Sequence, residues 1–304
     1  MRARLLTPLF TLIFISLATI ACQKSAPHAK KSAKQIPVVA VSIPPYTSLV
    51  KAIAGDSVHV VSVIGEKQNP HLSQSTFKQV DSIDKASLWI GIGESYEPKI
   101  LRVLKKTSPN MHILQMNKHF PLMRSEDDPL LPVSNSHGHG HAHSEMDPHF
   151  FLSPRFLSQE ATLIKDALIA IVPSQEIVFQ ENFEKLNKKI THLNQKLHSQ
   201  LGRVRGKGVL VSHSALGYFC YDFGLKQYAL ESHGKPLLPK TLDHILSHIP
   251  QDRILCAFTF IDHNNKALLE VANIMQVQTY EINPMAEDLL ATIDKIGDDL
   301  DNSL

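Results

Sequence analysis

The sequence has few cysteines and almost no excess of charge of either sign. It contains 31 Lys and Arg against 29 Asp and Glu, a formal net charge of +2. Proteins that bind nucleic acids carry clustered basic residues, so no nucleic-acid partner is expected. Of the three cysteines, only Cys220 and Cys256 lie in the body of the chain. They are compatible with one disulfide in an oxidising compartment, and equally with two buried free thiols.

A long membrane-spanning run is also missing, because the apolar stretch Leu5–Ala21 has about 17 residues, the short limit for crossing a bilayer. Basic residues precede it, and small residues end it, which is typical of a secretory signal at 1–21. An uncleaved membrane anchor is the alternative. Thr19-Ile-Ala-Cys22 resembles a bacterial lipobox, which implies lipidation of Cys22 and a membrane anchor. Residues 22–35, rich in Lys, Ser and Ala, then form a flexible tether.

Histidine, by contrast, is abundant, with 17 residues, and it is the commonest metal-ligating side chain. Four histidines alternate with Gly and Ala within the expected loop 121–146, namely His137, His139, His141 and His143. Such a loop loses conformational entropy when it binds a metal, so its affinity should be modest. It either gathers zinc for another site or is a solvated loop that binds only excess metal.

Short apolar runs alternate with longer helical patterns, which predicts an α/β fold with mostly parallel sheets flanked by helices. The expected strands are 36–42, 58–64, 87–92, 111–115, 209–212, 227–230, 254–260 and 277–282. Helices are expected at 46–54, 154–170 and 214–223. Residues 175–201 lack Pro and Gly and have apolar residues every three to four positions, which predicts one long helix of about 40 Å.

The long helix divides the pattern into two lobes. We expect an N-terminal α/β lobe at 36–173, a rigid linking helix at 174–204 and a C-terminal α/β lobe at 205–304. Ligands in open α/β sheets bind outside the carboxyl ends of the strands. The cleft between the lobes is therefore the expected site.

Three histidines follow predicted strands or lie in the loops that lead away from them. His71 and His149 each come directly after a proline, and His213 follows the strand 209–212. A proline restricts the local backbone and helps to hold a ligand in place. Three imidazoles suit a tetrahedral zinc ion and leave one position for another ligand.

These segments resemble a known family, the zinc- and manganese-binding solute-binding proteins of bacterial ABC importers (cluster A-I). Asn69-Pro-His71 is similar to its first ligand segment. Asp147-Pro-His149-Phe-Phe-Leu-Ser-Pro is similar to its Asp-Pro-His-x-Trp-Leu-Asp-Pro box, and Ser212-His213-Ser-Ala-Leu-Gly-Tyr is close to its third segment. The resemblance extends from about Ile36 to the C-terminal region.

The resemblance implies that His71, His149 and His213 bind the metal, with zinc favoured over manganese or iron because all three are imidazoles. The family's fourth ligand is an aspartate, and Asn283 takes its place here. The fourth position is thus open between Asn283, Glu281, Glu97 and water.

The resemblance further implies a non-enzymatic, exported protein, periplasmic or lipid-anchored, that delivers metal to a membrane permease with its cytoplasmic ATPase. Two alternatives remain. A secreted zinc metallohydrolase lacks support, because the sequence has no His-Glu-x-x-His segment. A metal-buffering adhesin would act without a permease.

The accessory interpretation of the histidine-rich loop leads to a deletion experiment. Removal of residues 137–143 should leave one high-affinity zinc site, because that affinity resides in the cleft histidines. Calorimetric titration measures it. Loss of the high-affinity site would refute the accessory role.

Overall fold

The computed structural model describes residues 36–72, 77–124, 146–232, 235–236, 246–247, 249, 253–261 and 263–304. The predicted signal peptide, Cys22 and the loop histidines His137 to His143 lie outside these ranges. Residues Ile36–Leu304 form one compact unit. Across the ranges given, the structure contains no helix that is long and apolar enough to cross a membrane.

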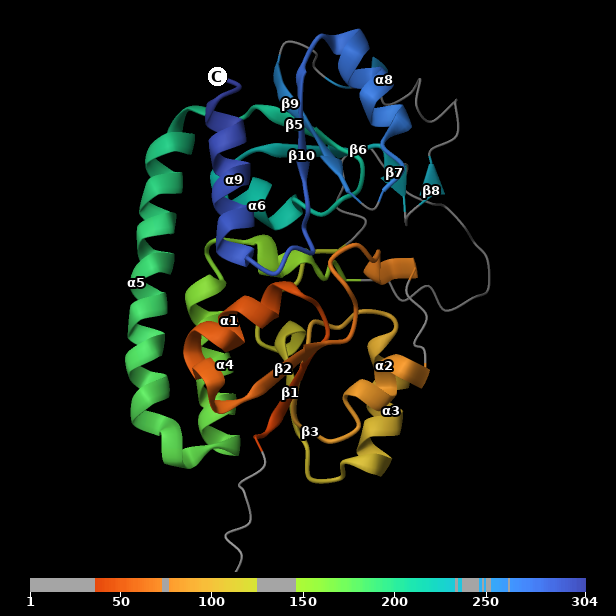
Figure 1. Ribbon diagram of the computed structural model, residues 1–304. Coiled ribbons are helices and arrows are strands. Elements are labelled where there is room, and N and C mark those ends of the chain that lie inside the picture. Colours follow the sequence, from red (N-terminus) through yellow and green to blue (C-terminus); the bar gives the residue numbers. More distant parts are fainter. Residues whose placement is uncertain are drawn as a thin grey trace, which may run out of the picture. The chain divides into compact units, whose positions relative to one another are not determined.

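Two four-stranded parallel sheets form the framework and confirm the predicted fold class (Figure 1). The first has the order β2-β1-β3-β4, with β1 Val38–Val41, β2 His59–Ser62, β3 Ala86–Gly91 and β4 His112–Gln115. The second has the order β10-β9-β5-β6, with β5 Gly208–Val211, β6 Lys226–Ala229, β9 Ile254–Phe260 and β10 Gln278–Ile282. The central strands are nearly continuous apolar runs, as expected for parallel strands covered by helices on both faces. A short antiparallel pair, β7 Glu231–Ser232 and β8 Lys235–Pro236, follows β6.

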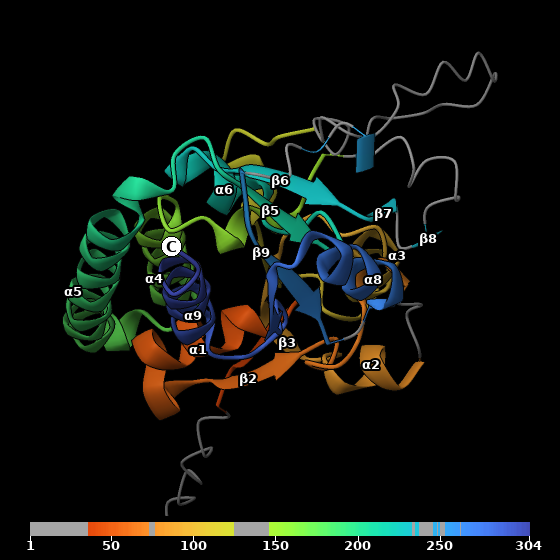
Figure 2. The ribbon, with the colours of Figure 1, turned by 90° about the horizontal axis from the view of Figure 1, so that it is seen from above.

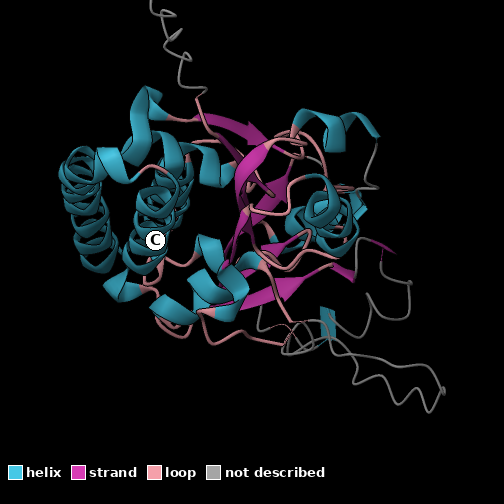
Figure 3. Ribbon diagram, turned by 90° about the horizontal axis from the view of Figure 1, so that it is seen from below, coloured by secondary structure: helices cyan, strands magenta, loops and turns pink. Residues whose placement is uncertain are grey.

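The helices surround these sheets. The expected ones are α1 Pro45–Ala54, α4 Leu157–Ile171, α5 Glu176–Gln200 and α6 Gly217–Phe223. The structure adds α2 Phe77–Ser82, α3 Glu97–Thr107, α8 Lys266–Met275 and α9 Leu289–Asp301, for which the sequence analysis made no prediction. Helix α6 is shorter than predicted, since it begins at Gly217 rather than Ser214. In Figure 3 the strands lie between two groups of helices.

Helix α5, 25 residues long, connects the two lobes as predicted. It packs against α1 and α4 beside the first sheet and against α9 beside the second (Figures 1 and 2). Its buried face consists of Phe179, Phe183, Leu186, Ile190, Leu193 and Leu197. On its polar side, Lys196 Nζ forms ion pairs with Asp294 at 2.6 Å and Asp298 at 2.7 Å on α9. Both lobes therefore pack against one continuous helix.

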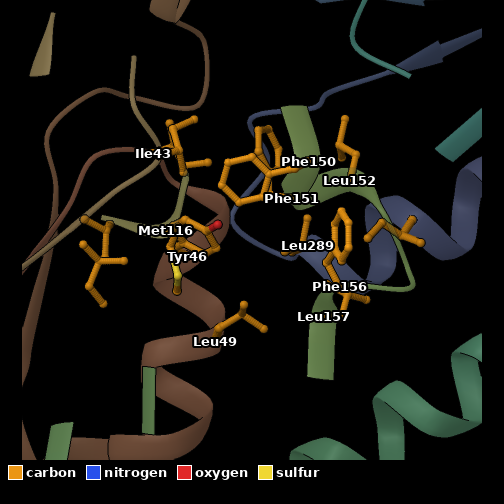
Figure 4. Close-up of a cluster of buried hydrophobic side chains, with 14 of the residues drawn as sticks. Ile43, Tyr46, Leu49, Met116, Phe150, Phe151, Leu152, Phe156, Leu157 and Leu289 are labelled. Atoms are coloured by element: carbon orange, nitrogen blue, oxygen red, sulfur yellow. The ribbon is translucent and has the colours of Figure 1, made fainter. Parts of the chain in front are cut away.

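The hydrophobic core extends from the first sheet to the segment Phe150–Leu152, which lies before α4. Phe150, Phe151 and Leu152 are completely buried. In Figure 4 Phe150 and Phe151 lie between Tyr46 on one side and Leu152, Phe156 and Leu289 on the other. Because Leu289 comes from α9, residues distant in sequence pack around this short segment. The residue just before it, His149, is thereby held in a fixed position.

The two cysteines in the body of the chain are both buried. Cys256, within β9, is a free thiol, and burial raises its pKa to about 12. The structure has no Cys220–Cys256 disulfide, and it agrees with the second interpretation, two buried thiols.

The buried Glu160 on α4 provides a test of the core. It is fully buried, no described residue hydrogen-bonds its carboxyl oxygens, and burial raises its pKa well above the ordinary value of 4.5. The folded protein thus keeps the proton that the unfolded chain loses above pH 4.5. Stability from this residue is fully present below that pH and falls at higher pH, by about 1.4 kcal/mol per unit until the folded pKa is reached. Glu160→Gln should match the parent at pH 4 and be more stable at pH 8 in urea unfolding. An equal difference at both pH values would contradict this.

Candidate metal site

A pocket lies between the two lobes, at the carboxyl ends of their strands. From the N-terminal part it is lined by Gln68, Asn69, Pro70, His71 and His149. From the C-terminal part it is lined by His213, Ala215, Phe260, His263, Asn283, Pro284 and Met285. All three predicted histidines thus share one pocket, at the place where α/β folds bind ligands.

His71 lies in a short 3-10 helix, Pro70–Leu72, after β2. Its backbone N–H donates to Asn69 Oδ1 at 2.9 Å, so the asparagine of Asn-Pro-His fixes the turn that carries His71. Its Nδ1 lies 3.3 Å from Glu94 Oε2, just beyond β3. Gly93 adopts a φ of 98°, which lets the chain turn there and brings the Glu94 carboxylate to His71.

The Glu94 carboxylate is ionised although it is buried. Burial alone would raise its pKa, but the hydrogen bond from His71 and the nearby charges of His71 and His149 outweigh burial and lower that pKa. An ionised carboxylate can only accept hydrogen bonds. The carboxylate therefore accepts from His71 Nδ1, and Nε2 of the ring points toward the other two histidines.

His149 begins a second short 3-10 helix, His149–Leu152. Asp147 Oδ1 accepts from both the backbone N–H of His149 at 2.9 Å and its Nδ1 at 2.7 Å. The Asp-Pro-His sequence thus makes a turn in which the aspartate orients the histidine ring. As with His71, the carboxylate faces Nδ1, and Nε2 points toward the other rings of the cluster.

His213 follows β5 by two residues and is 8% exposed. Its carbonyl accepts from the backbone N–H of Ala215 at 2.7 Å, which tightens the turn. Its Nε2 lies 3.0 Å from His71 Nε2. This residue is the contribution of the second sheet to the cluster.

The three rings form one cluster, with centroid separations of 5.2, 4.8 and 5.2 Å. His71 Nε2 lies 3.4 Å from His149 Nε2 and 3.0 Å from His213 Nε2. Two nitrogens bound to one tetrahedral zinc at about 2.0–2.1 Å are about 3.3 Å apart. The spacing of the cluster therefore fits a single zinc-sized cation.

The candidates for a fourth ligand lie in different places. Asn283 lines the pocket, and its Oδ1 accepts from the backbone N–H of Met285 at 3.0 Å. Glu97 instead accepts from the backbone N–H groups of Ile92 at 2.8 Å and Gly93 at 3.1 Å. Glu281 is exposed on β10. Neither glutamate is among the side chains that line the pocket in the part of the chain that the structure describes.

His263, which follows β9, also lines the pocket and was not predicted from the sequence. Its ring stacks on that of His213, with centroids 4.8 Å apart and an interplanar angle of 15°. His213, Glu231 and His263 form a second group with metal-ligating atoms within 4.8 Å of one another. The signal that identified His213, a histidine after a predicted strand, applies equally to His263.

Known proteins resemble this chain in sequence and in fold. Residues 39–295 match the model of a family described as zinc-uptake complex component A, periplasmic. A Chlamydia muridarum protein whose name refers to metal binding is 30% identical over 260 residues, covering 84% of this chain and 87% of the relative. The zinc-binding lipoprotein AdcA of Streptococcus pneumoniae is 26% identical over 298 residues, covering 93% of this chain and 56% of AdcA. The fold is similar to a crystal structure of ZnuA, with a TM-score of 0.76, 21% identity, and coverage of 88% of this chain and 98% of that one.

Tyr218 on α6 provides a test of how the site is held. Its hydroxyl donates to the carbonyl of Asp147 at 2.9 Å and accepts from the backbone N–H of Met123 at 2.7 Å. Tyr218→Phe removes both bonds and should lower the free energy of unfolding by about 1–3 kcal/mol. Urea denaturation measures this loss. Tyr221→Phe is the matched control, because Tyr221 lies on the same helix and is 64% exposed. Equal stability of both variants would contradict the bridging role.

Proposed function

Because the chain belongs to the family of periplasmic zinc-uptake components, we propose that it binds zinc outside the cytoplasm and delivers it to the membrane permease of an ABC importer. Members of this family are solute-binding components of transport systems and form no class of enzymes. The proposed ligands are His71, His149 and His213. The proposed partner is a permease with its cytoplasmic ATPase.

The observation that carries the proposal is the contact between His71 Nε2 and His149 Nε2 at 3.4 Å. Carboxylates face Nδ1 of both rings, so both Nε2 atoms point into the same space, and His213 Nε2 lies 3.0 Å from His71 Nε2. Three imidazole nitrogens that converge in this way suit one tetrahedral cation. This convergence supports a cation as the natural occupant.

The donor set supports zinc in particular. Imidazole nitrogen suits zinc, whereas manganese prefers carboxylate and carbonyl oxygen. The carboxylates of Glu94 and Asp147 lie behind the rings, so they offset the charge of the ion and make the imidazoles better donors without occupying its ligand positions. The proposed selectivity follows from nitrogen donors facing the pocket and oxygen donors behind them.

The linking helix supports a modest conformational change on binding and release. The ligands come from both lobes, so release requires their separation. Helix α5 packs against elements of both lobes, and a long helix shared in this way resists wide hinge opening. We propose the lobe boundaries given by the sequence, 36–173 and 205–304 around the helix 174–204.

Lipid attachment and the histidine-rich loop complete the proposal. The lipobox-like segment ending at Cys22 supports an anchor at the outer surface of the membrane, and the similar AdcA of Streptococcus pneumoniae is named a lipoprotein. The loop histidines His137 to His143 would act as an accessory that collects zinc near the cleft.

Substitution of the cluster tests the metal assignment. His71→Ala, His149→Ala and His213→Ala should each weaken zinc binding by more than about 100-fold, since even partners behind the ligands contribute about 10- to 100-fold. Chelator-competition titrations with zinc and with manganese measure both affinities, and the parent should prefer zinc. His192→Ala is the control, because His192 is an exposed histidine on α5. A triple variant that binds zinc as tightly as the parent would rule out the cleft site.

A further inference from the structure

His263 is held in the pocket by its own loop after β9. Its backbone N–H donates to the carbonyl of Phe260 at 3.2 Å. Asn265 fixes the same strand end, because its side chain bonds both the N–H of Phe260 at 3.1 Å and its carbonyl at 2.8 Å. The His263 side chain is only 10% exposed. These contacts hold the His263 side chain in one orientation, in which it lines the pocket.

A buried carboxylate determines which nitrogen of His263 carries the proton. Nδ1 lies 3.0 Å from Glu231 Oε2, and the Glu231 side chain is 5% exposed. On the other side of the ring, Nε2 lies 3.5 Å from Asn69 Nδ2. The orientation of the Asn69 amide is set, because its oxygen accepts from the N–H of His71. Asn69 therefore presents a donor to His263, and Nε2 must carry the lone pair.

The same arrangement occurs three times around the pocket. His71 is backed by Glu94, His149 by Asp147 and His263 by Glu231, each through Nδ1. Metal-bound histidines are usually oriented in this way by a carboxylate, with the opposite nitrogen on the metal. Simple core packing does not require a carboxylate behind a histidine at all three positions.

The geometry points to His263 Nε2 as the fourth ligand of the zinc bound by His71, His149 and His213, with Glu231 as the positioning residue behind it. This inference rests on the proposed zinc binding. Coordination exchanges the 3.5 Å contact with Asn69 for a bond to the metal. His263 lines the same pocket and its ring stacks on that of His213, so the exchange is a rotation of one side chain within the pocket.

Asn283 is the weaker candidate for the same position. Its side-chain oxygen already accepts from Met285 N–H. A neutral amide oxygen is also a poorer partner for zinc than imidazole is. A histidine after β9 thus compensates for the neutral residue that stands after β10.

The first experiment measures zinc affinity by chelator competition in the full mature chain. His263→Ala should weaken binding by about 100-fold, and Asn283→Ala by less than about threefold. His192→Ala, on the surface of α5, is the control and should match the parent. Thermal unfolding without metal checks that each variant is folded. Unchanged affinity in a folded His263→Ala variant overturns the inference.

A second measurement detects coordination directly. With half an equivalent of Co²⁺, His263→Cys should add a thiolate-to-cobalt charge-transfer band in the near ultraviolet that the parent lacks. His71→Cys is the positive control and His192→Cys the negative one. A band for His71→Cys without one for His263→Cys overturns the inference, as does a second tight zinc in the parent that His263→Ala alone removes.

The role of Glu231 is tested by a double-mutant cycle. Glu231→Gln should weaken zinc binding by about tenfold in the parent and not at all in the His263→Ala background. An equal loss in both backgrounds would show that Glu231 acts independently of His263 and overturn its positioning role. If the parent itself binds no zinc, the proposed function fails as a whole. If the parent binds zinc and His263→Ala binds it equally well, only this inference fails.

Discussion

The orientation of the histidine rings by buried carboxylates is the interaction on which the site depends. Asp147 and Glu94 contact Nδ1 of His149 and His71, and this turns the two Nε2 atoms toward each other across 3.4 Å. Without the carboxylates, either ring could rotate away from the cluster. The carboxylates therefore hold the ring nitrogens close together in the pocket. Preorganisation of this kind reduces the reorganisation needed when the metal binds.

The fold supplies the rigidity that this arrangement of rings requires. His149 precedes the completely buried segment Phe150–Leu152, whose position is determined by packing from α1, α4 and α9. Tyr218 ties the carbonyl of Asp147 to the second lobe. Helix α5 then keeps both sheets at a fixed separation through its contacts with α1, α4 and α9. The core, the linking helix and the site are thus one mechanical unit, which accounts for ligands drawn from both lobes.

The parts that follow local patterns were predictable from the sequence. The eight main strands and α5 depend on apolar periodicity and on the positions of Pro and Gly, and the structure confirms them within a few residues. The meeting of His71, His149 and His213 in one pocket was also expected, because strand ends converge in α/β folds.

The partners of the histidines were not predictable, since they depend on tertiary geometry. Glu94 rather than Glu97 reaches His71 because Gly93 has a positive φ, and no pattern distinguishes two glutamates three residues apart. His263 enters the pocket through the loop after β9, and its neighbours Glu231 and His213 are distant in sequence. Histidines are densest at 137–143 in the sequence, whereas the single His149, oriented by Asp147, is one of the residues that line the pocket.

We propose that the interlobe histidines, and not the histidine-rich loop, hold the high-affinity zinc. A crystal structure of the protein with one equivalent of zinc, with anomalous scattering recorded at the zinc edge, is the most direct test. One strong peak is expected at about 2.0–2.1 Å from the Nε2 atoms of His71, His149 and His213. A peak located elsewhere, with the three Nε2 atoms bound to no metal, would contradict it.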